Sequence, residues 1–156
     1  MYAWLLAILQ WLHVLCGIFW FGSVLTADFI VLPTLRSLSA PMQQAFLRAF
    51  VNQVPKLVAG VAGATILLGL IRGIAGGVLD RLSSPYGLTW IAAFIVGSSL
   101  LFLGLRILTP AGRRLAEMPP GPEFEAALVG VKRLTITELA GFMVILALMI
   151  AMRFGY

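Results

Sequence analysis

Four long apolar runs divide the chain, separated by short polar stretches. They cover about residues 3–32, 56–79, 87–108 and 134–154. At about 1.5 Å per residue in a helix, each run reaches or exceeds the ~30 Å thickness of a bilayer's hydrocarbon core. The pattern therefore predicts an all-α integral membrane protein. We expect one domain over residues 1–156, built as a transmembrane four-helix bundle.

The segment between the first two runs, from Ser39 to Pro55, has a different pattern. Its polar and apolar residues are interleaved, so a helix formed there would have one apolar face. A short helix of this kind is typical of segments that lie in the membrane interface. We therefore expect an interfacial helix between the first and second spans. The interleaved residues are Gln43, Gln44, Phe46, Leu47, Arg48, Phe50, Val51 and Asn52.

Composition excludes a water-soluble domain. Hydrophobic residues make up 61% of the 156 positions and charged residues only 11%, whereas soluble domains carry about 25% charged residues. The net charge of +5 would suggest a nucleic-acid partner in a soluble protein. Here the basic residues lie between the apolar runs, so we expect them to contact the lipid bilayer and to set topology, with no nucleic-acid partner.

The distribution of basic residues predicts the orientation. Eight lysines and arginines lie after the first run or at and beyond the end of the third, whereas only three lie towards the opposite side. Because cytoplasmic loops carry the excess of basic residues, both termini are expected outside a multi-pass protein of the inner (plasma) membrane. The eight are Arg36, Arg48, Lys56, Arg106, Arg113, Arg114, Lys132 and Arg133, and the three are Arg72, Arg81 and Arg153.

One histidine, His13, lies near the middle of the first run and is the main candidate for chemistry. Cys16, Gly17 and Trp20 share its helical face. An imidazole in a membrane helix, with a glycine one turn away and an aromatic wall, is typical of an axial ligand to haem iron. The structural alternative is a histidine bonded to the backbone of a neighbouring helix, and spacing alone does not separate the two. Cys16 is the only cysteine, and we interpret it as a packing residue.

A haem would need further contacts. With a single histidine in the chain, the iron is either bound by His13 and a methionine, five-coordinate, or shared across a dimer. Counted from the helix ends, Met143 lies at the depth of His13, so it is the candidate second ligand. Arg72, within the second run, is the candidate partner for a haem propionate. Arg81 and Arg153 are further candidates, and snorkelling to the head groups is the alternative for all three.

Two acids also lie within or beside apolar sequence. Glu138 is expected to form an interhelical ion pair with Lys56, Arg106 or Lys132, and a proton relay is the alternative. Asp28 is expected at the interface, paired with Arg36 or Lys56.

Glycines recur at a spacing of four in the second run, at Gly69, Gly73 and Gly77. Small residues at this spacing let helix backbones approach closely in lipid. The pattern is compatible with packing inside the bundle or with the interface of a homodimer, which we expect for this protein.

The first run carries a family resemblance. Its segment Trp11-Leu12-His13-Val14-Leu15, the following Gly17-Ile18-Phe19-Trp20-Phe21-Gly22 and the closing Leu32-Pro33 are similar to the opening helix of small membrane proteins of the copper-resistance-D-like group. They resemble, more distantly, the four-helix bacterial protoporphyrinogen oxidase family, in which a first-helix histidine is associated with haem b. The Pro55-Lys56-Leu57 entry into a glycine-rich second helix extends the likeness. The resemblance implies that His13 is a haem ligand.

These observations favour a membrane protein that binds haem b through His13, with Gly17, Trp20, Arg72 and Met143 around the cofactor. Electron transfer to a redox partner or haem-linked redox chemistry would be its function. A protoporphyrinogen oxidase-like enzyme is the first alternative. A copper-handling or accessory membrane protein without haem is the second, and the sequence leaves open whether the protein is catalytic.

Overall fold

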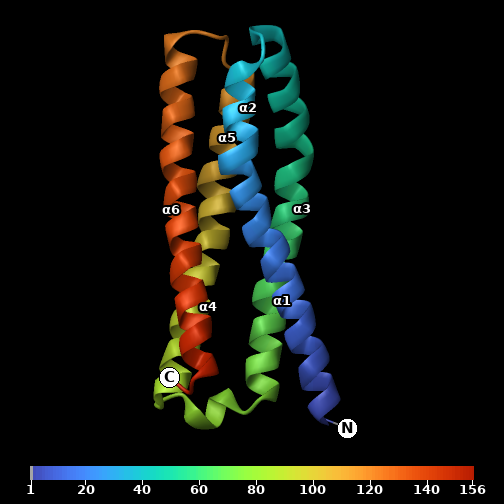
Figure 1. The fold of residues 1–156 in the computed structure, drawn as a ribbon, viewed down its shortest axis with the longest axis vertical. Coiled ribbons are helices and arrows are strands. Elements are labelled where there is room, and N and C mark those ends of the chain that lie inside the picture. Colours follow the sequence, from blue (N-terminus) through green and yellow to red (C-terminus); the bar gives the residue numbers. More distant parts are fainter. Residues whose placement is uncertain (1) are drawn as a thin grey trace.

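The computed structural model describes residues 2–156, which are helical almost throughout and contain no strand (Figure 1). Nine helical segments follow one another along the chain. They are α1 Tyr2–Thr26, the π-turn η1 Ala27–Val31, α2 Leu32–Ser37, α3 Ala40–Ala75, the 3₁₀ turn η2 Val78–Arg81, α4 Pro85–Leu103, the π-turn η3 Gly104–Leu108, α5 Thr109–Glu117 and α6 Pro122–Arg153.

These segments join into four long rods that lie side by side (Figure 1). Within the described residues, four stretches are long and apolar enough to cross a membrane: Tyr2–Ser37, Ala40–Ala75, Pro85–Glu117 and Pro122–Arg153. The predicted all-α, four-helix membrane bundle is therefore confirmed. The rods have 32 to 36 residues, which at about 1.5 Å per residue is roughly 50 Å, well beyond the hydrocarbon thickness.

The predicted interfacial helix does not form as a separate element. Residues 40–55 are instead the first half of α3, which continues unbroken through Pro55 to Ala75. Their apolar face is buried against protein: Leu47 and Val51 belong to a cluster with Leu115 and Phe124. The prediction was wrong because this apolar face, which the sequence pattern could equally have placed against lipid, is covered by α5 and the start of α6.

A second core lies in the middle of the bundle and joins all four rods. It comprises Trp20, Val24, Ala62, Leu100 and Phe142. The rings of Trp20 and Phe142 meet edge to face, with centroids 4.9 Å apart and an interplanar angle of 84°. Such a pair is worth about 0.5–1.5 kcal/mol beyond its buried area. This aromatic contact fixes α1 against α6 and closes one end of the cavity described below.

Two π-turns interrupt the first and third rods at equivalent places. η1 begins at Ala27 and η3 at Gly104, and each begins six residues before a proline, Pro33 or Pro110. In each turn a backbone N–H reaches five residues back: Leu32 donates to Ala27 and Thr109 to Gly104. Proline has no N–H and its ring crowds the carbonyl four residues earlier, so the widened turn accommodates it.

The two halves of the chain consequently follow one plan. Each half has a first rod with a π-turn and a proline, followed by a long second helix, α3 or α6. The first rod of each half packs along its own second helix. The two termini therefore lie at the same end of the bundle (Figure 1).

Candidate functional site

A cavity of about 650 Å³ lies between the four rods, in the half of the bundle that holds the termini. This volume falls within the ~300–1,000 Å³ usual for small-molecule and cofactor sites. Residues from α1, α3, α4 and α6 line it, and most of them are apolar. Val14, Ile18 and Leu146 stand at its edge with exposed side chains, so the cavity is open there to the surroundings of the bundle.

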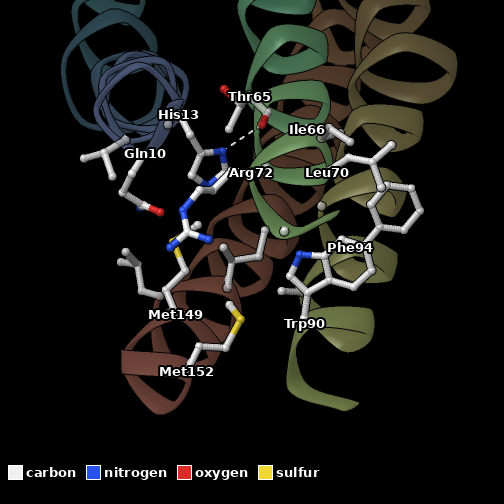
Figure 2. Close-up of a pocket in the computed structure, with 18 of the residues that line it drawn as sticks. Gln10, His13, Thr65, Ile66, Leu70, Arg72, Trp90, Phe94, Met149 and Met152 are labelled. Carbon is white, nitrogen blue, oxygen red and sulfur yellow. Dashed lines mark hydrogen bonds between the residues drawn. The ribbon is translucent and has the colours of Figure 1, made fainter. Parts of the chain in front are cut away.

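His13 projects from α1 into this cavity. Its Nδ1 lies 2.8 Å from the backbone oxygen of Thr65 on α3, as Figure 2 shows. A carbonyl oxygen only accepts hydrogen bonds, so Nδ1 carries the proton and donates. In a neutral imidazole the other nitrogen, Nε2, then keeps its lone pair. This is the hydrogen bond expected of a histidine with a purely structural role, bonded to the backbone of a neighbouring helix. It also leaves Nε2 free to bind a metal.

A glycine on α3 makes room for the imidazole. A Cβ at Gly69 would stand 2.8 Å from Cε1 of His13 and 3.1 Å from its Nδ1. Any side chain at this position would therefore push the ring away from the Thr65 carbonyl. One turn further, a Cβ at Gly73 would collide with the indole of Trp90. Gly69 and Gly73 thus pack against side chains of this same chain.

Arg72 is the principal cation of the cavity. Its Nε is buried and has no hydrogen-bond partner among the described residues. The guanidinium lies on the side of the imidazole away from Thr65 (Figure 2) and is close enough for its charge to act on His13. A buried guanidinium nitrogen without an acceptor is costly, so the cavity is suited to a ligand that brings an anionic group.

The polar residues that line the cavity give it a positive character. Arg153 joins Arg72, whereas none of the described residues that line it is acidic. The cavity therefore combines apolar walls with a cationic side, the chemistry expected for a flat apolar ligand with carboxylate substituents. The polar or partly polar lining residues are Gln10, His13, Trp20, Thr65, Arg72, Tyr86, Trp90 and Arg153.

The structure brings four of the five residues singled out by the sequence to this cavity. His13, Gly17, Trp20 and Arg72 line it, with Trp20 only 3% exposed at its inner end. Met143 does not line it and is 47% exposed on the outside of α6. Helical phase explains the difference, because the inward face of α6 passes through Phe142, Ile145, Met149 and Met152 and not through Met143.

Sequence reasoning missed several lining residues. Met149 and Met152, which the depth count passed over in favour of Met143, both point into the cavity (Figure 2). Counting from the helix ends misjudged their depth, since α1 extends beyond the end of α6 at the terminal end of the bundle (Figure 1). Their spacing of three residues, which places both methionines on one face of the helix, was the signal in the sequence that could have identified them. Trp90 and Phe94 lie in a run that is apolar on all sides, so its pattern does not distinguish a helical face towards the cavity from one towards lipid.

Neither of the ion pairs expected for the two acids is present as predicted. Both carboxylate oxygens of Asp28 are buried without a hydrogen-bond partner among the described residues. The basic residues proposed for Asp28 and Glu138, including Lys56 and Arg106, have exposed side chains. Asp28 is therefore directed into the bundle and not towards the head groups.

Comparison with family models, curated proteins and solved structures finds no match to this chain. The resemblance of residues 11–33 to the copper-resistance-D-like group thus stays a prediction. The four-helix fold and the geometry of the cavity are the basis for the function proposed next.

Proposed function

We propose that this protein binds haem b in the cavity between its four rods, with His13 as an axial ligand through Nε2. The observation that carries the proposal is the hydrogen bond from Nδ1 of His13 to the Thr65 carbonyl. Metal-binding histidines commonly donate their second ring nitrogen to a backbone carbonyl, which fixes the tautomer and the orientation of the ring. His13 has this arrangement before any ligand is bound.

The residues around His13 fit a haem. The buried Nε of Arg72 lacks an acceptor, and a propionate would supply one in a charge-assisted hydrogen bond. Arg153 lines the same cavity and would serve a second propionate. Apolar residues from all four rods would contact the porphyrin faces, and Gly17 adds no side chain to that space.

A bound haem would supply one-electron redox chemistry, which suits electron transfer across or along a membrane. The chain itself would hold the iron through His13 and the propionates through its arginines. Its apolar walls, with Trp20 and Phe142 at the inner end, would exclude water. A dry environment disfavours the net positive charge of an oxidised centre and so raises the reduction potential.

Met149 or Met152 is the better candidate for a second axial ligand than Met143, because both line the cavity with His13. A thioether ligand raises the potential of a haem. The midpoint potential should therefore fall on substitution of the liganding methionine by leucine, whereas Met143→Leu should leave it unchanged. If neither Met149→Leu nor Met152→Leu changes the potential, the iron is not bound by a methionine of this chain's cavity.

The simplest test is the absorption spectrum of the purified protein, made with haem supplied and without a histidine tag. The wild type should be red with a Soret band, and His13→Ala should lose it. Cys16→Ala is the matched control, since Cys16 lies on the same helix and does not line the cavity. A colourless wild type would contradict the proposal. Turnover of protoporphyrinogen by the haem-loaded protein would instead assign it to the oxidase-like alternative.

One observation favours a second candidate function, the binding of copper. The cavity gathers His13, Met149 and Met152, and an imidazole with thioethers is a ligand set suited to Cu(I). A Met149→Leu/Met152→Leu double variant separates the two functions, because it should abolish copper binding and still bind haem. Metal analysis of protein purified after growth with copper provides the measurement.

Orientation and assembly remain part of the proposal. Arg72, Arg81 and Arg153 belong to the end of the bundle that holds both termini, and the eight other basic residues belong to the opposite half. This separation supports an orientation with both termini outside. A homodimer would need a surface other than Gly69 and Gly73, which pack within the chain.

A further inference from the structure

Two carboxylic acids lie in the middle of the bundle, apart from the cavity. Asp28 belongs to the π-turn η1, and both of its carboxylate oxygens are shielded from solvent without a hydrogen-bond partner among the described residues. Glu138 lies on α6 and is only 6% exposed. Burying an ionised carboxylate at membrane depth without a partner is costly, so these groups need an explanation.

The two acids share one place. Helix α6, which carries Glu138, contacts both π-turns, and Asp28 in η1 lies near enough for a charge on one carboxyl group to act on the other. A Cβ at Gly104 would lie 3.8 Å from Oε1 of Glu138, so this carboxyl group lies against the start of η3. Asp28 and Glu138 are therefore held between the two π-turns, one from each half of the chain.

Neither acid forms an ion pair with a basic side chain among the described residues. Five basic residues on the segments packed around it have exposed side chains: Arg36 on α2, Lys56 on α3, Arg106 in η3, and Lys132 and Arg133 on α6. Arg72 lies in the cavity, whose inner end is closed by Trp20 and Phe142. The pair thus has no ion-pair partner among the described residues, either from the cavity or from the half of the bundle opposite the termini.

Two neighbouring carboxylates in a medium of low dielectric constant do not both ionise, because each raises the cost of charging the other. A shared proton removes one charge and lets one carboxyl group donate a hydrogen bond to the other. We propose that Asp28 and Glu138 form a proton-binding site within the membrane, distinct from the His13 cavity. The reaction is the uptake of one proton from water by the pair, and its release reverses that step.

The surrounding backbone suits such a site. Both acids lie beside π-turns that precede a proline, Pro33 or Pro110, whose nitrogen has no hydrogen to donate to the backbone of the turn. π-turns are frequent at functional sites in membrane and soluble helices.

Infrared spectroscopy of the purified protein in nanodiscs tests the proposal. A protonated carboxyl group has a carbonyl stretching band that an ionised one lacks. The wild type should show this band at neutral pH, shifted in Asp28→Asn and in Glu138→Gln and absent from the double variant. Glu117→Gln, which changes an exposed acid on α5, should leave the band unchanged. A wild type without the band, or a double variant that keeps it, overturns the proposal.

Thermal unfolding against pH provides a second measurement. If the folded pair holds its proton more tightly than the unfolded chain does, the folded state binds more protons and stability falls as the pH rises. The wild-type Tm should therefore decrease between about pH 6 and pH 9 relative to that of the double variant, whose amides cannot ionise. If the Tm of the two proteins depends on pH in the same way, the proposal is contradicted. A rise in the wild-type Tm on addition of Na⁺ also contradicts it, because the site would then bind a metal cation in place of the proton.

The haem content of the double variant tests whether the acid pair is a site separate from the cavity of the proposed function. Because the pair lies outside the cavity, the variant should bind haem as the wild type does. Loss of haem from the double variant would mean that the two sites are one, and would overturn the assignment of a distinct proton site.

Discussion

The two ring nitrogens of His13 have different surroundings. Nδ1 donates to the Thr65 carbonyl across 2.8 Å, and Nε2 remains as a lone-pair donor inside the cavity. The hydrogen bond to the backbone alone contributes only about 0.5–1.5 kcal/mol of stability, which is a small gain for a histidine within an apolar helix. At the residue scale, the arrangement is better explained by the orientation that the bond gives to Nε2.

The glycine beneath His13 supplies the first prediction. Gly69→Ala should displace the imidazole, since the new Cβ would stand 2.8 Å from its Cε1, and should lower haem affinity by about 10- to 100-fold, the usual effect of disturbing the partner of a metal ligand. Haem titration followed by absorption measures the loss. Gly63→Ala is the control on the same helix, because a Cβ there meets nothing within 4 Å. Equal affinities of the two variants would contradict this account of Gly69.

Arg72 supplies the second prediction. Arg72→Gln removes the cation whose Nε is buried without an acceptor, so haem affinity should fall by about tenfold or more, as expected for the loss of a charge-assisted hydrogen bond. Arg72→Lys should recover only part of it, since lysine lacks the planar fork. Arg81→Gln serves as the control: Arg81 is exposed near the same end of the bundle and does not line the cavity. An Arg72→Gln protein that binds haem with wild-type affinity would exclude a propionate contact.

At the scale of elements, α3 departs most from the expectation. Its first half was expected on the membrane surface, and instead packs Leu47 and Val51 into a core with Leu115 and Phe124. An amphipathic pattern states that one face is apolar, but it does not state whether lipid or protein covers that face. The covering residues lie about 70 positions further along the chain, beyond the reach of any local pattern.

A truncation in this core supplies the third prediction. Leu47 is buried, so Leu47→Ala should cost about 2–5 kcal/mol of stability and lower the Tm in detergent. Met42→Ala, on the same helix at an exposed position, should leave the Tm near that of the wild type. If the two variants have the same Tm, the first half of α3 does not pack against α5 and α6 as described.

The four spans themselves followed from the sequence, because apolar runs of more than 20 residues have few alternatives. His13, Gly17, Trp20 and Arg72, which the sequence singled out, were found to line one cavity, since they share faces of two adjacent helices. Met143 was not. Residue counts predict the depth of a side chain along its helix, but the direction in which the side chain points depends on its position around the helix and on the offset between neighbouring rods. The inward direction of Asp28 depends on the π-turn, which the pattern of apolar residues does not reveal.

At the scale of the whole molecule, two similar halves enclose two different sites. The first half provides His13, Arg72 and Asp28, and the second provides Trp90, Met149 and Glu138. The cavity lies towards the termini and the acid pair towards the centre, with Trp20 and Phe142 between the rods at the inner end of the cavity. In the proposed function, a redox centre and a proton site would thus lie at different depths of one membrane protein.

In the proposed function, His13 binds the iron of a haem. Because the chain contains a single histidine, protein labelled with ¹⁵N-histidine and purified through a tag without histidine reports on this residue alone. Pulsed electron paramagnetic resonance of the oxidised, haem-loaded protein should detect a strong hyperfine coupling between the iron and the labelled nitrogen. A haem-loaded sample in which the iron shows no coupling to ¹⁵N would contradict the claim.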